Sequence, residues 1–327
     1  MCIRDRSYCI FGGSGFIGTH LIALIDNLYP GTKIYNLDIV ENNHEGKSTY
    51  INCDVRSEIN IDIPVTSEDV IFNFAAVHRT PGHPDQAYFE TNIRGAENVC
   101  AFAEKFGIKK IVFTSSIAPY GAAEDLKTEE TLPTPNTPYG ISKLVAEKIH
   151  TIWQAKKLNE RQLTIVRPGV VFGKGENGNF TRLYWGIRGG KFFYPGRKDT
   201  IKACIYVKEL VRFMLYRLEN HSEGVELYNC TFESAFTIEQ IVETMKKATG
   251  LQRTIVKVPG SLLMTVASIV GPLGGKALGI CPARVKKLMI STNICGKKLA
   301  DSGYKFHYTF EEAIKDWYRD NDGQCLR

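Results

Sequence analysis

Residues 8–18 have the sequence YCIFGGSGFIG, in which a short apolar run leads into glycines and then into an apolar helical pattern. The spacing of Gly12, Gly15 and Gly18 permits a tight turn, a close approach of the backbone to a pyrophosphate, and close packing of a helix on a strand. A helix that begins at Phe16 presents the free N–H groups of Phe16 and Ile17, and its positive dipole end, to phosphates. The stretch therefore predicts a dinucleotide-binding turn.

Strand and helix patterns alternate through the first half of the chain. We predict strands at Tyr8–Phe11, Lys33–Asp38, Tyr50–Asn52, Val70–Phe74, Ile111–Thr114 and Leu163–Val166, and helices at Phe16–Leu28, Tyr88–Phe106 and Tyr139–Lys157. Alternation of this kind produces parallel βαβ units. We therefore predict an α/β fold with a Rossmann-like, doubly wound parallel sheet.

The alternation becomes less regular after Pro168. In the second half we predict a strand at Glu226–Cys230 and helices at Phe180–Arg188, Val207–Glu219, Ile238–Ala248, Leu262–Val270, Ala283–Ile290 and Phe310–Arg319. We expect residues 7–168 to form the cofactor-binding domain, rejoined by about residues 204–231. Residues 169–327 then form a smaller C-terminal substrate-binding lobe over the carboxyl ends of the strands. Residues 1–6 fit neither a strand nor a cap, and we expect them to be a non-native lead-in.

The composition is typical of a soluble globular protein, with 327 residues, 43% hydrophobic and 23% charged, and a net charge of +6. Lys and Arg are spread along the chain, which argues against nucleic acid as a partner. The nine cysteines include no Cys-x-x-Cys pair, so we expect reduced thiols in a cytoplasmic protein and no metal site. Residues 261–280 are apolar but are interrupted by glycines, Pro272 and Lys276, so we do not expect them to span a membrane.

The second predicted strand ends at Asp38, 20 residues after Gly18. A carboxylate at this place accepts hydrogen bonds from the adenosine ribose hydroxyls and repels a 2′-phosphate, so we expect NAD rather than NADP. The alternative is a chance Gly-rich turn with a surface aspartate, which the strand, helix and spacing together disfavour. Further candidates for cofactor contacts follow the third and fourth strands: Asp54, Val55, Ala75 and Ala76.

A second motif, Tyr139-Gly140-Ile141-Ser142-Lys143, opens a predicted helix. Its i, i+4 spacing places the Tyr139 phenol and the Lys143 ammonium on one face of that helix. A tyrosine with an ordinary pKa of about 10 is a weak base near neutrality, whereas a neighbouring ammonium and a positively charged nicotinamide favour the phenolate. Ser116, just past the fifth strand, can hydrogen-bond the reacting oxygen, and Lys143 can hold the nicotinamide ribose. Seen alone, the Tyr/Lys pair would indicate only an amphipathic helix.

Further motifs accompany the glycine turn, Asp38 and the Tyr139/Lys143 pair in a fixed order: Asp54-Val55, Asn73-Phe74-Ala75-Ala76, Asn92 with Gly95, Ser115-Ser116 with Tyr120-Gly121, Arg167-Pro168, and the patterns at 205–210 and 299–314. In this order they resemble the extended short-chain dehydrogenase/reductases of the sugar epimerase/dehydratase type. The resemblance implies a general base at Tyr139, assisted by Ser116 and Lys143, with Pro168 in the cofactor site. It also implies hydride transfer between a sugar carbon and NAD through a transient 4-keto sugar, and a homodimer paired through the helices at 88–106 and 139–157.

Dehydratases of this family carry Asp-Glu directly after the catalytic Ser or Thr, where this chain has Ile117-Ala118. We therefore expect an epimerase acting at C4 of an activated sugar, because the preference for NAD fits an epimerase better than a reductase. A 4-keto-sugar reductase remains an alternative. So does a steroid- or flavonoid-type hydroxyl dehydrogenase, which shares Arg167-Pro168-Gly169 and the same base. A non-enzymatic NAD-sensing regulator is a further alternative, although such a protein usually loses the Tyr/Lys pair.

The sequence leaves two alternatives for the carrier of the sugar, a nucleotide and a polyprenyl diphosphate. Nucleotide-sugar epimerases often have Asn where this chain has Val170, and Arg where it has Lys202, a point charge in place of a bidentate fork. Residues 75–79, 171–173, 202–203 and 284–287 are similar to epimerases that act on N-acetylglucosamine linked to undecaprenyl diphosphate. The apolar segment 261–280 suits either a peripheral contact with the inner face of the cell membrane or a lid over the substrate pocket. Our candidate substrate contacts are His78, Arg79, Ser116, Asn179 and Lys202.

Overall fold

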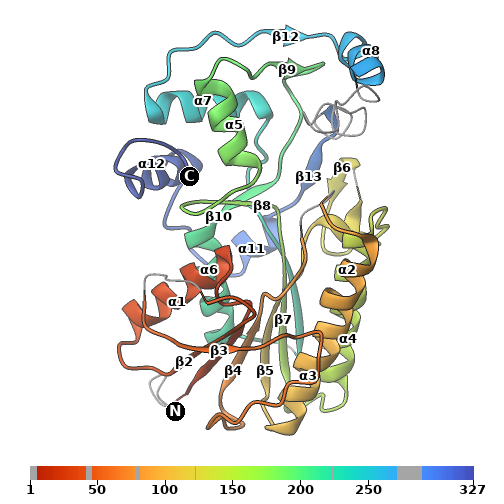
Figure 1. Ribbon diagram of the computed structural model, residues 1–327, viewed down its shortest axis with the longest axis vertical. Coiled ribbons are helices and arrows are strands. Elements are labelled where there is room, and N and C mark those ends of the chain that lie inside the picture. Colours follow the sequence, from red (N-terminus) through yellow and green to blue (C-terminus); the bar gives the residue numbers. More distant parts are fainter. Residues whose placement is uncertain (1–5, 42–45, 79–81, 122, 223, 271–288) are drawn as a thin grey trace.

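A seven-stranded parallel sheet forms the centre of the computed structural model, which describes residues 6–41, 46–78, 82–121, 123–222, 224–270 and 289–327 (Figure 1). Its strands are β1 (Tyr8–Phe11), β2 (Ile34–Asp38), β3 (Thr49–Asn52), β4 (Val70–Asn73), β5 (Lys110–Thr114), β7 (Gln162–Pro168) and β11 (Val225–Cys230). They lie in the order β11-β7-β5-β4-β1-β2-β3, and every neighbouring pair is parallel. The strand order reverses on either side of β1, which confirms the predicted doubly wound α/β fold.

Helices cover both faces of the sheet (Figure 1). One face carries α1 (Phe16–Leu28) and α6 (Val207–Glu219); the other carries α2 (Asp85–Phe89), a π-helical turn (Glu90–Arg94), α3 (Gly95–Lys105) and α4 (Pro138–Ala155). Alternate side chains of β1 pack on opposite faces of the sheet. Tyr8 and Ile10 lie in the core under α1 and α6, and Cys9 and Phe11 lie in the core under α3 and α4. Each fully buried large apolar side chain contributes roughly 1.5–3 kcal/mol. Because both faces are covered, the central strands are apolar runs rather than alternating ones.

The second half of the chain builds a lobe above the carboxyl ends of the strands (Figure 1). Its elements are β8 (Val170–Phe172), α5 (Asn179–Arg188), β9 (Tyr194–Pro195), β10 (Cys204–Tyr206), α7 (Ile238–Thr249), β12 (Lys257–Val258), α8 (Gly260–Val270), β13 (Thr292–Ile294) and α12 (Phe310–Arg319). The short helix α11 (Lys297–Asp301) packs against β11, and its Leu299 joins the core under α1 and α6. An aromatic cluster around Phe172 holds the lobe together, with ring centroids 4.8 Å from Phe180 and 6.0 Å from Trp317.

The structure differs from the predicted elements in several places. The helix expected over 88–106 begins at Asp85 and contains the π-helical turn before Gly95, where a Cβ would lie 2.8 Å from Val55 Cγ2. The sequence analysis missed the short strands β9 and β10, and it also missed β6 (Ala123–Lys127), which pairs with β13. Most of the helix expected over 283–290 lies outside the described residues. Within the part that is described, no helix has the length and apolar character needed to cross a bilayer.

Candidate active site

The glycine turn joins β1 to α1 and leaves a bare surface at the start of the helix. Gly12 has a φ of +76°, and a Cβ there would lie 2.7 Å from the Ala75 backbone nitrogen. A Cβ on Gly18 would lie 2.6 Å from the Gly12 carbonyl oxygen, so both positions require glycine. Gly15 is the N-cap of α1 and provides no side-chain cap, which leaves the N–H groups at Phe16 and Ile17 free for an anion. The turn therefore fits the diphosphate of a dinucleotide.

Asp38 lies at the end of β2, directly beside this turn. Its Oδ2 accepts a hydrogen bond from the Ser14 backbone nitrogen at 3.1 Å, and its Oδ1 accepts one from the Val40 nitrogen at 3.2 Å. The Asn36 side chain, also on β2, donates to Ser14 Oγ at 3.0 Å and fixes the same turn. The carboxylate thus stands where the ribose of a bound adenosine would lie, as the spacing from Gly18 predicts.

The other proposed cofactor residues lie near the carboxyl ends of β3, β4 and β7. Asp54 forms an ion pair with Arg56, with an Nη2–Oδ2 distance of 2.6 Å, and hydrogen bonds from Arg56 hold the pKa of the carboxyl below its usual value. Val55 is buried against Gly95 of α3. Ala75 and Ala76 follow β4, where the Ala75 backbone touches Gly12. At the end of β7, the Pro168 carbonyl accepts a hydrogen bond from Ile117 at 3.2 Å, which places Pro168 next to the loop of Ser116.

Ser116, Tyr139 and Lys143 come together at the carboxyl edge of the sheet. Helix α4 begins after Thr137, whose hydroxyl caps it by accepting from the Gly140 nitrogen at 3.0 Å. This start places Tyr139 in the first turn, where its phenol hydrogen-bonds the Ser116 hydroxyl. Lys143 lies one turn further along the helix, is buried, and has its Nζ 4.4 Å from the centroid of the Phe113 ring. The proposed catalytic triplet is therefore assembled from β5 and α4.

Burial works against the charged forms of both Tyr139 and Lys143. It raises the pKa of Tyr139, and the hydrogen bond from Ser116 only partly offsets this effect. Burial also lowers the pKa of Lys143 to about 7, against the opposing influence of the Glu147 carboxylate. From the sequence we expect Lys143 and a positively charged nicotinamide together to favour the phenolate. Among the protein's own groups burial has the largest effect on the Tyr139 pKa, so the phenolate needs a further positive charge beside it, as the expected nicotinamide would provide.

A buried network behind Lys143 was missed by the sequence analysis. Glu147, one turn after Lys143, accepts two hydrogen bonds from Arg167 of β7, at 2.8 and 2.6 Å, and one from the Ser115 hydroxyl at 2.5 Å. The Arg167 guanidinium stacks on Tyr120, 4.7 Å from its ring centroid. Glu147 continues the i, i+4 series of Tyr139 and Lys143, and this spacing was the signal in the sequence that could have identified it.

Two further side chains hold α4 against the sheet. Asn92 accepts from the Val77 nitrogen at 2.9 Å and donates to Ser142 Oγ at 2.8 Å, so it ties the loop after β4 to the turn between Tyr139 and Lys143. His150 stacks on Phe113 at a centroid distance of 4.1 Å, and burial lowers its pKa to about 4, so the imidazole is neutral near pH 7.

The proposed substrate residues are less closely grouped than the catalytic ones. His78 is exposed in the loop after β4, and the adjacent Arg79 lies outside the described residues. Asn179 opens α5, and its Oδ1 accepts from Arg182 at 3.1 Å. Lys202 donates from Nζ to the Ile290 carbonyl at 2.7 Å and so links two segments of the lobe. Of the described members of this group, Ser116 is the one that hydrogen-bonds Tyr139.

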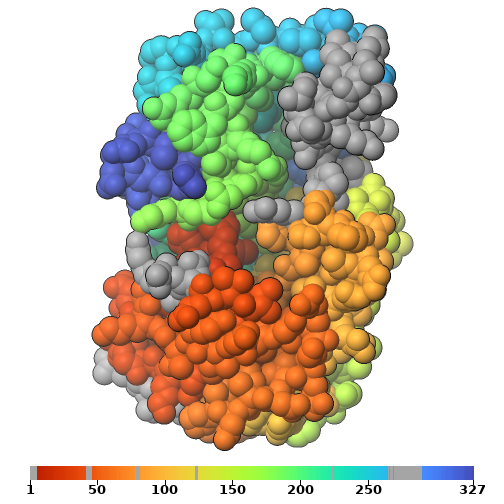
Figure 2. Space-filling model, in the orientation of Figure 1, coloured from red at the N-terminus to blue at the C-terminus, as the bar shows by residue number. Residues whose placement is uncertain are grey.

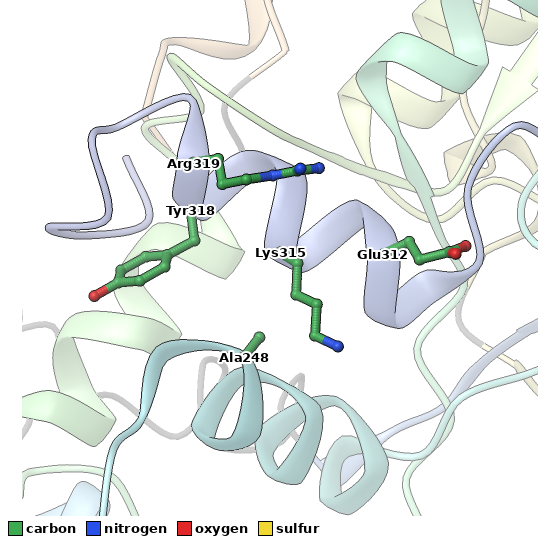
Figure 3. A pocket seen from close by; sticks show the side chains of 5 residues that line it. All are labelled: Ala248, Glu312, Lys315, Tyr318 and Arg319. Carbon is green, nitrogen blue, oxygen red and sulfur yellow. The ribbon is translucent and has the colours of Figure 1, made fainter.

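The molecular surface is hollowed between the N-terminal half and the lobe, with the start of the chain, in red, set back at its floor (Figure 2). A second hollow lies elsewhere, between α7 and α12, and is lined by Ala248, Glu312, Lys315, Tyr318 and Arg319 (Figure 3). This second hollow contains none of the residues singled out from the sequence, so we place the chemistry in the first.

Comparison with known proteins agrees with this geometry. Residues 8–231 match the NAD dependent epimerase/dehydratase family. The chain is 32% identical over 308 residues to the N-acetyl-alpha-D-glucosaminyl-diphospho-ditrans,octacis-undecaprenol 4-epimerase of Escherichia coli O157:H7, covering 93% of this chain and 92% of that protein. It is 25% identical to the 3beta-hydroxysteroid-dehydrogenase/decarboxylase isoform 1 of Arabidopsis thaliana, over 95% of this chain and 78% of that protein.

The fold is also similar to that of a solved structure, the UDP-glucose 4-epimerase of Thermus thermophilus in complex with NAD. The TM-score is 0.71 at 17% identity, with 97% of this chain and 99% of that chain covered. The glycine turn, the order of the strands and the match over 8–231 agree with one another, and the chain belongs to the NAD-dependent epimerase/dehydratase family.

Proposed function

We propose that the protein is an NAD-dependent 4-epimerase of a sugar carried on a polyprenyl diphosphate. The observation that carries the proposal is the meeting of Ser116, Tyr139 and Lys143 at the carboxyl edge of the sheet that also carries the glycine turn, where ligands of doubly wound folds bind. A nucleotide-linked sugar is the second candidate, since both kinds of carrier present a sugar on a diphosphate.

Each member of the triplet has a role in this proposal. Tyr139 takes the proton from the sugar 4-hydroxyl and later returns it, while Ser116 hydrogen-bonds the same oxygen and fixes its distance from the phenol. Lys143, supported by Glu147, favours the phenolate and holds the nicotinamide ribose. NAD, when bound, would supply the hydride acceptor and a further positive charge beside the phenol. Gly12, Gly15, Gly18 and Asp38 would hold the dinucleotide, the glycines by leaving room for its diphosphate and Asp38 by accepting from its ribose.

Epimerisation fits the surroundings of Ser116 better than dehydration does. Ile117 and Ala118 stand where an elimination would need an acid and a base, and neither side chain can transfer a proton. The Ala118 nitrogen instead donates to Ser116 Oγ at 3.1 Å, which fixes the hydroxyl. The Arabidopsis relative keeps a hydroxysteroid dehydrogenase as the alternative from another substrate class, and it would use the same base.

The preference for a lipid carrier rests on two observations. The E. coli relative, named for an undecaprenol-linked substrate, matches nearly the whole chain. Val170 lies in β8 opposite Cys204 and offers no amide to a nucleotide diphosphate, and Lys202 is engaged with the Ile290 carbonyl. With such a carrier we expect the protein to work at the inner face of the cell membrane. We also keep the expectation that residues 261–280 contribute to that contact.

The decisive experiment supplies N-acetylhexosamine substrates carrying deuterium at C4, on UDP or on undecaprenyl diphosphate, to the NAD-loaded protein. An epimerase returns the same hydride, so the product keeps its deuterium and needs no added reduced cofactor. Conversion of the lipid-linked substrate alone supports the proposal, and conversion of the nucleotide form alone contradicts the carrier. Product that appears only with added reduced cofactor, or oxidation of a hydroxysteroid in place of a sugar, contradicts epimerisation.

We further propose a homodimer formed through α2, α3 and α4. The exposed apolar side chains on this face are Phe89, Ile141, Val145 and Ile152, with exposed fractions of 37%, 40%, 36% and 60%. A patch of this kind on helices marks a contact with another chain. The molar mass in solution tests the proposal: a dimer is expected for the parent and a monomer for V145E, whereas a monomeric parent contradicts it.

A further inference from the structure

The end of the lobe that is remote from the sheet has an unusual distribution of charge. It is formed by residues 177–198, which include α5 and β9, and residues 244–270, which include β12 and α8 (green and cyan in Figures 1 and 2). These two segments contain nine of the chain's 41 Lys and Arg and none of its 35 Asp and Glu. The rest of the chain has 32 basic against 35 acidic residues. Four of the nine pair with acids outside the two segments, and the other five, Arg182, Arg188, Lys191, Arg253 and Lys257, form no ion pair with an acid among the described residues.

Large apolar side chains are exposed in the same place. Trp185, Phe193, Val256 and Leu262 have exposed fractions of 45%, 37%, 63% and 55%. They belong to adjoining segments, because β9 pairs with β12 directly after Phe193 and Val256, and α8 begins two residues beyond β12. The chain also turns back after Trp185, where the Phe192 nitrogen donates to the Gly186 carbonyl at 3.0 Å.

Cations accompany these apolar side chains without acidic partners. The Arg188 guanidinium lies over Trp185, 5.2 Å from its ring centroid, and Arg253 donates to the Arg188 carbonyl at 3.4 Å. Among the residues that the structure describes, no acid forms an ion pair with Arg188, Lys191, Arg253 or Lys257. The pKa of Asp199 is lowered mainly by a hydrogen bond from Arg197 and to a lesser extent by the charge of Lys257.

Three lysines at the margins of the same two segments are neutralised by acids outside them. Lys198 pairs with Glu239 at 2.7 Å, Lys246 with Glu243 at 2.9 Å, and Lys247 with Glu311 at 3.0 Å. Arg188, Lys191, Arg253 and Lys257 differ from these lysines, because among the described residues they have no ion-pair partner and belong to the segments that also expose the apolar side chains. This coincidence distinguishes the lobe end from the α4 face, where the exposed apolar residues suit a second copy of the chain.

We propose that this surface, the cationic lobe end (Trp185, Phe193, Val256, Leu262, Arg188, Lys191, Arg253 and Lys257), rests on an anionic lipid bilayer. The inference rests on the proposed function, because a polyprenyl-linked sugar is presented at a membrane. Aromatic and aliphatic side chains enter the headgroup region while Lys and Arg attract anionic lipids, and the exposed side chains here supply both. A second copy is a poorer occupant, since a two-fold contact would bring like charges together.

Vesicle binding tests the proposal, with a reporter already present in the chain. Trp153 and Trp317 are 1% and 0% exposed, so Trp185 is the tryptophan that can meet lipid. We expect vesicles of phosphatidylglycerol with phosphatidylcholine to shift the tryptophan emission to shorter wavelength and to sediment the protein, and we expect added salt to release it. Vesicles of pure phosphatidylcholine should bind far less.

Variants locate the contact. Each cation near an anionic surface contributes about fivefold in affinity, so K191E combined with R253E should weaken binding by at least about 25-fold. W185S should also weaken binding, whereas L28S, which alters a side chain of the same 45% exposure on α1, should not. Equal binding to both kinds of vesicle, or unchanged binding of the charge-reversal variant, overturns the proposal, as does capture of an acidic protein in place of lipid.

Activity separates this inference from the function on which it rests. Conversion of a water-soluble, short-chain polyprenyl-diphosphate substrate should be the same for the parent and K191E/R253E. Vesicle binding without conversion of any lipid-linked sugar would support the membrane-binding surface and contradict the polyprenyl-diphosphate carrier. Conversion of lipid-linked sugar by a protein that binds no anionic vesicles would support the carrier and contradict the membrane-binding surface.

Discussion

Glu147→Gln separates the electrostatic role of the buried network from its structural role. The Glu147 carboxylate holds Arg167 through two hydrogen bonds, and the side chains of both residues are only 4% exposed. Removing the charge of one partner from a buried pair costs about 3–5 kcal/mol of stability. With an unfolding entropy of about 2.1 cal/mol/K per residue over 327 residues, that loss lowers Tm by about 4–7 °C.

The same change should alter the chemistry through Lys143. Burial lowers the pKa of Lys143 to about 7 and the Glu147 charge opposes that shift, so its loss lowers the pKa further. Less positive charge on Lys143 at neutral pH disfavours the Tyr139 phenolate. We therefore expect the acidic limb of the kcat/KM profile to move to higher pH, with a loss of roughly tenfold at neutral pH.

Glu226→Gln is the matched control for this experiment. Glu226 forms a similar buried pair with Arg217, with side chains 3% and 5% exposed and Nη2–Oε1 at 2.5 Å, but it lies on β11 at the edge of the sheet. The Glu226→Gln variant should lose a comparable free energy of unfolding and keep the kcat/KM pH profile of the parent. Equal displacement of the profile in both variants, or an unmoved profile in Glu147→Gln, would refute the reasoning.

Further changes test the cofactor turn and the buried histidine. Asp38→Asn should weaken NAD binding by roughly tenfold, because the ribose loses a charged acceptor, and should allow NADP to bind, because the 2′-phosphate is no longer repelled. Cofactor titration measures both affinities, and an unchanged ratio of NAD to NADP affinity would contradict the role of Asp38 in cofactor choice. Gly18→Ala should abolish NAD binding, since its Cβ would lie 2.6 Å from the Gly12 oxygen, whereas Gly186→Ala, with 3.4 Å to its nearest neighbour, should bind normally. The His150 pKa of about 4 lies below its unfolded value of about 6.5, so the unfolded chain binds the proton first as pH falls. Urea unfolding should therefore show about 3 kcal/mol lost between pH 6.5 and 4, and His150→Gln should lack that loss.

Much of the fold and of the central site could be predicted because its signals are local in the sequence. The glycine spacing, the position of Asp38 and the i, i+4 pair of Tyr139 and Lys143 each depend on residues within one element or one βαβ unit. Their geometry follows once the neighbouring strand and helix form. The apolar runs of the central strands were equally plain, because covering both faces of the sheet requires them.

The remaining features depend on partners that are distant in the sequence. Glu147 meets Arg167 across 20 residues, and Lys202 meets the Ile290 carbonyl across 88. The short strands β6 and β13 have no periodicity of their own and exist because they pair with each other. The effect of burial on the Lys143 pKa likewise depends on how closely β5 and α4 pack, which the motif alone does not specify.

The account depends most on a proton leaving the substrate hydroxyl for the oxygen of Tyr139. Its direct test compares NAD-loaded parent and Tyr139→Phe in the turnover of the C4-deuterated, undecaprenyl-diphosphate-linked N-acetylhexosamine. NAD binding by the variant is first shown to equal that of the parent. The account predicts that the variant epimerises at least about a hundredfold more slowly. A variant that retains NAD and turns over at the parent rate would contradict it.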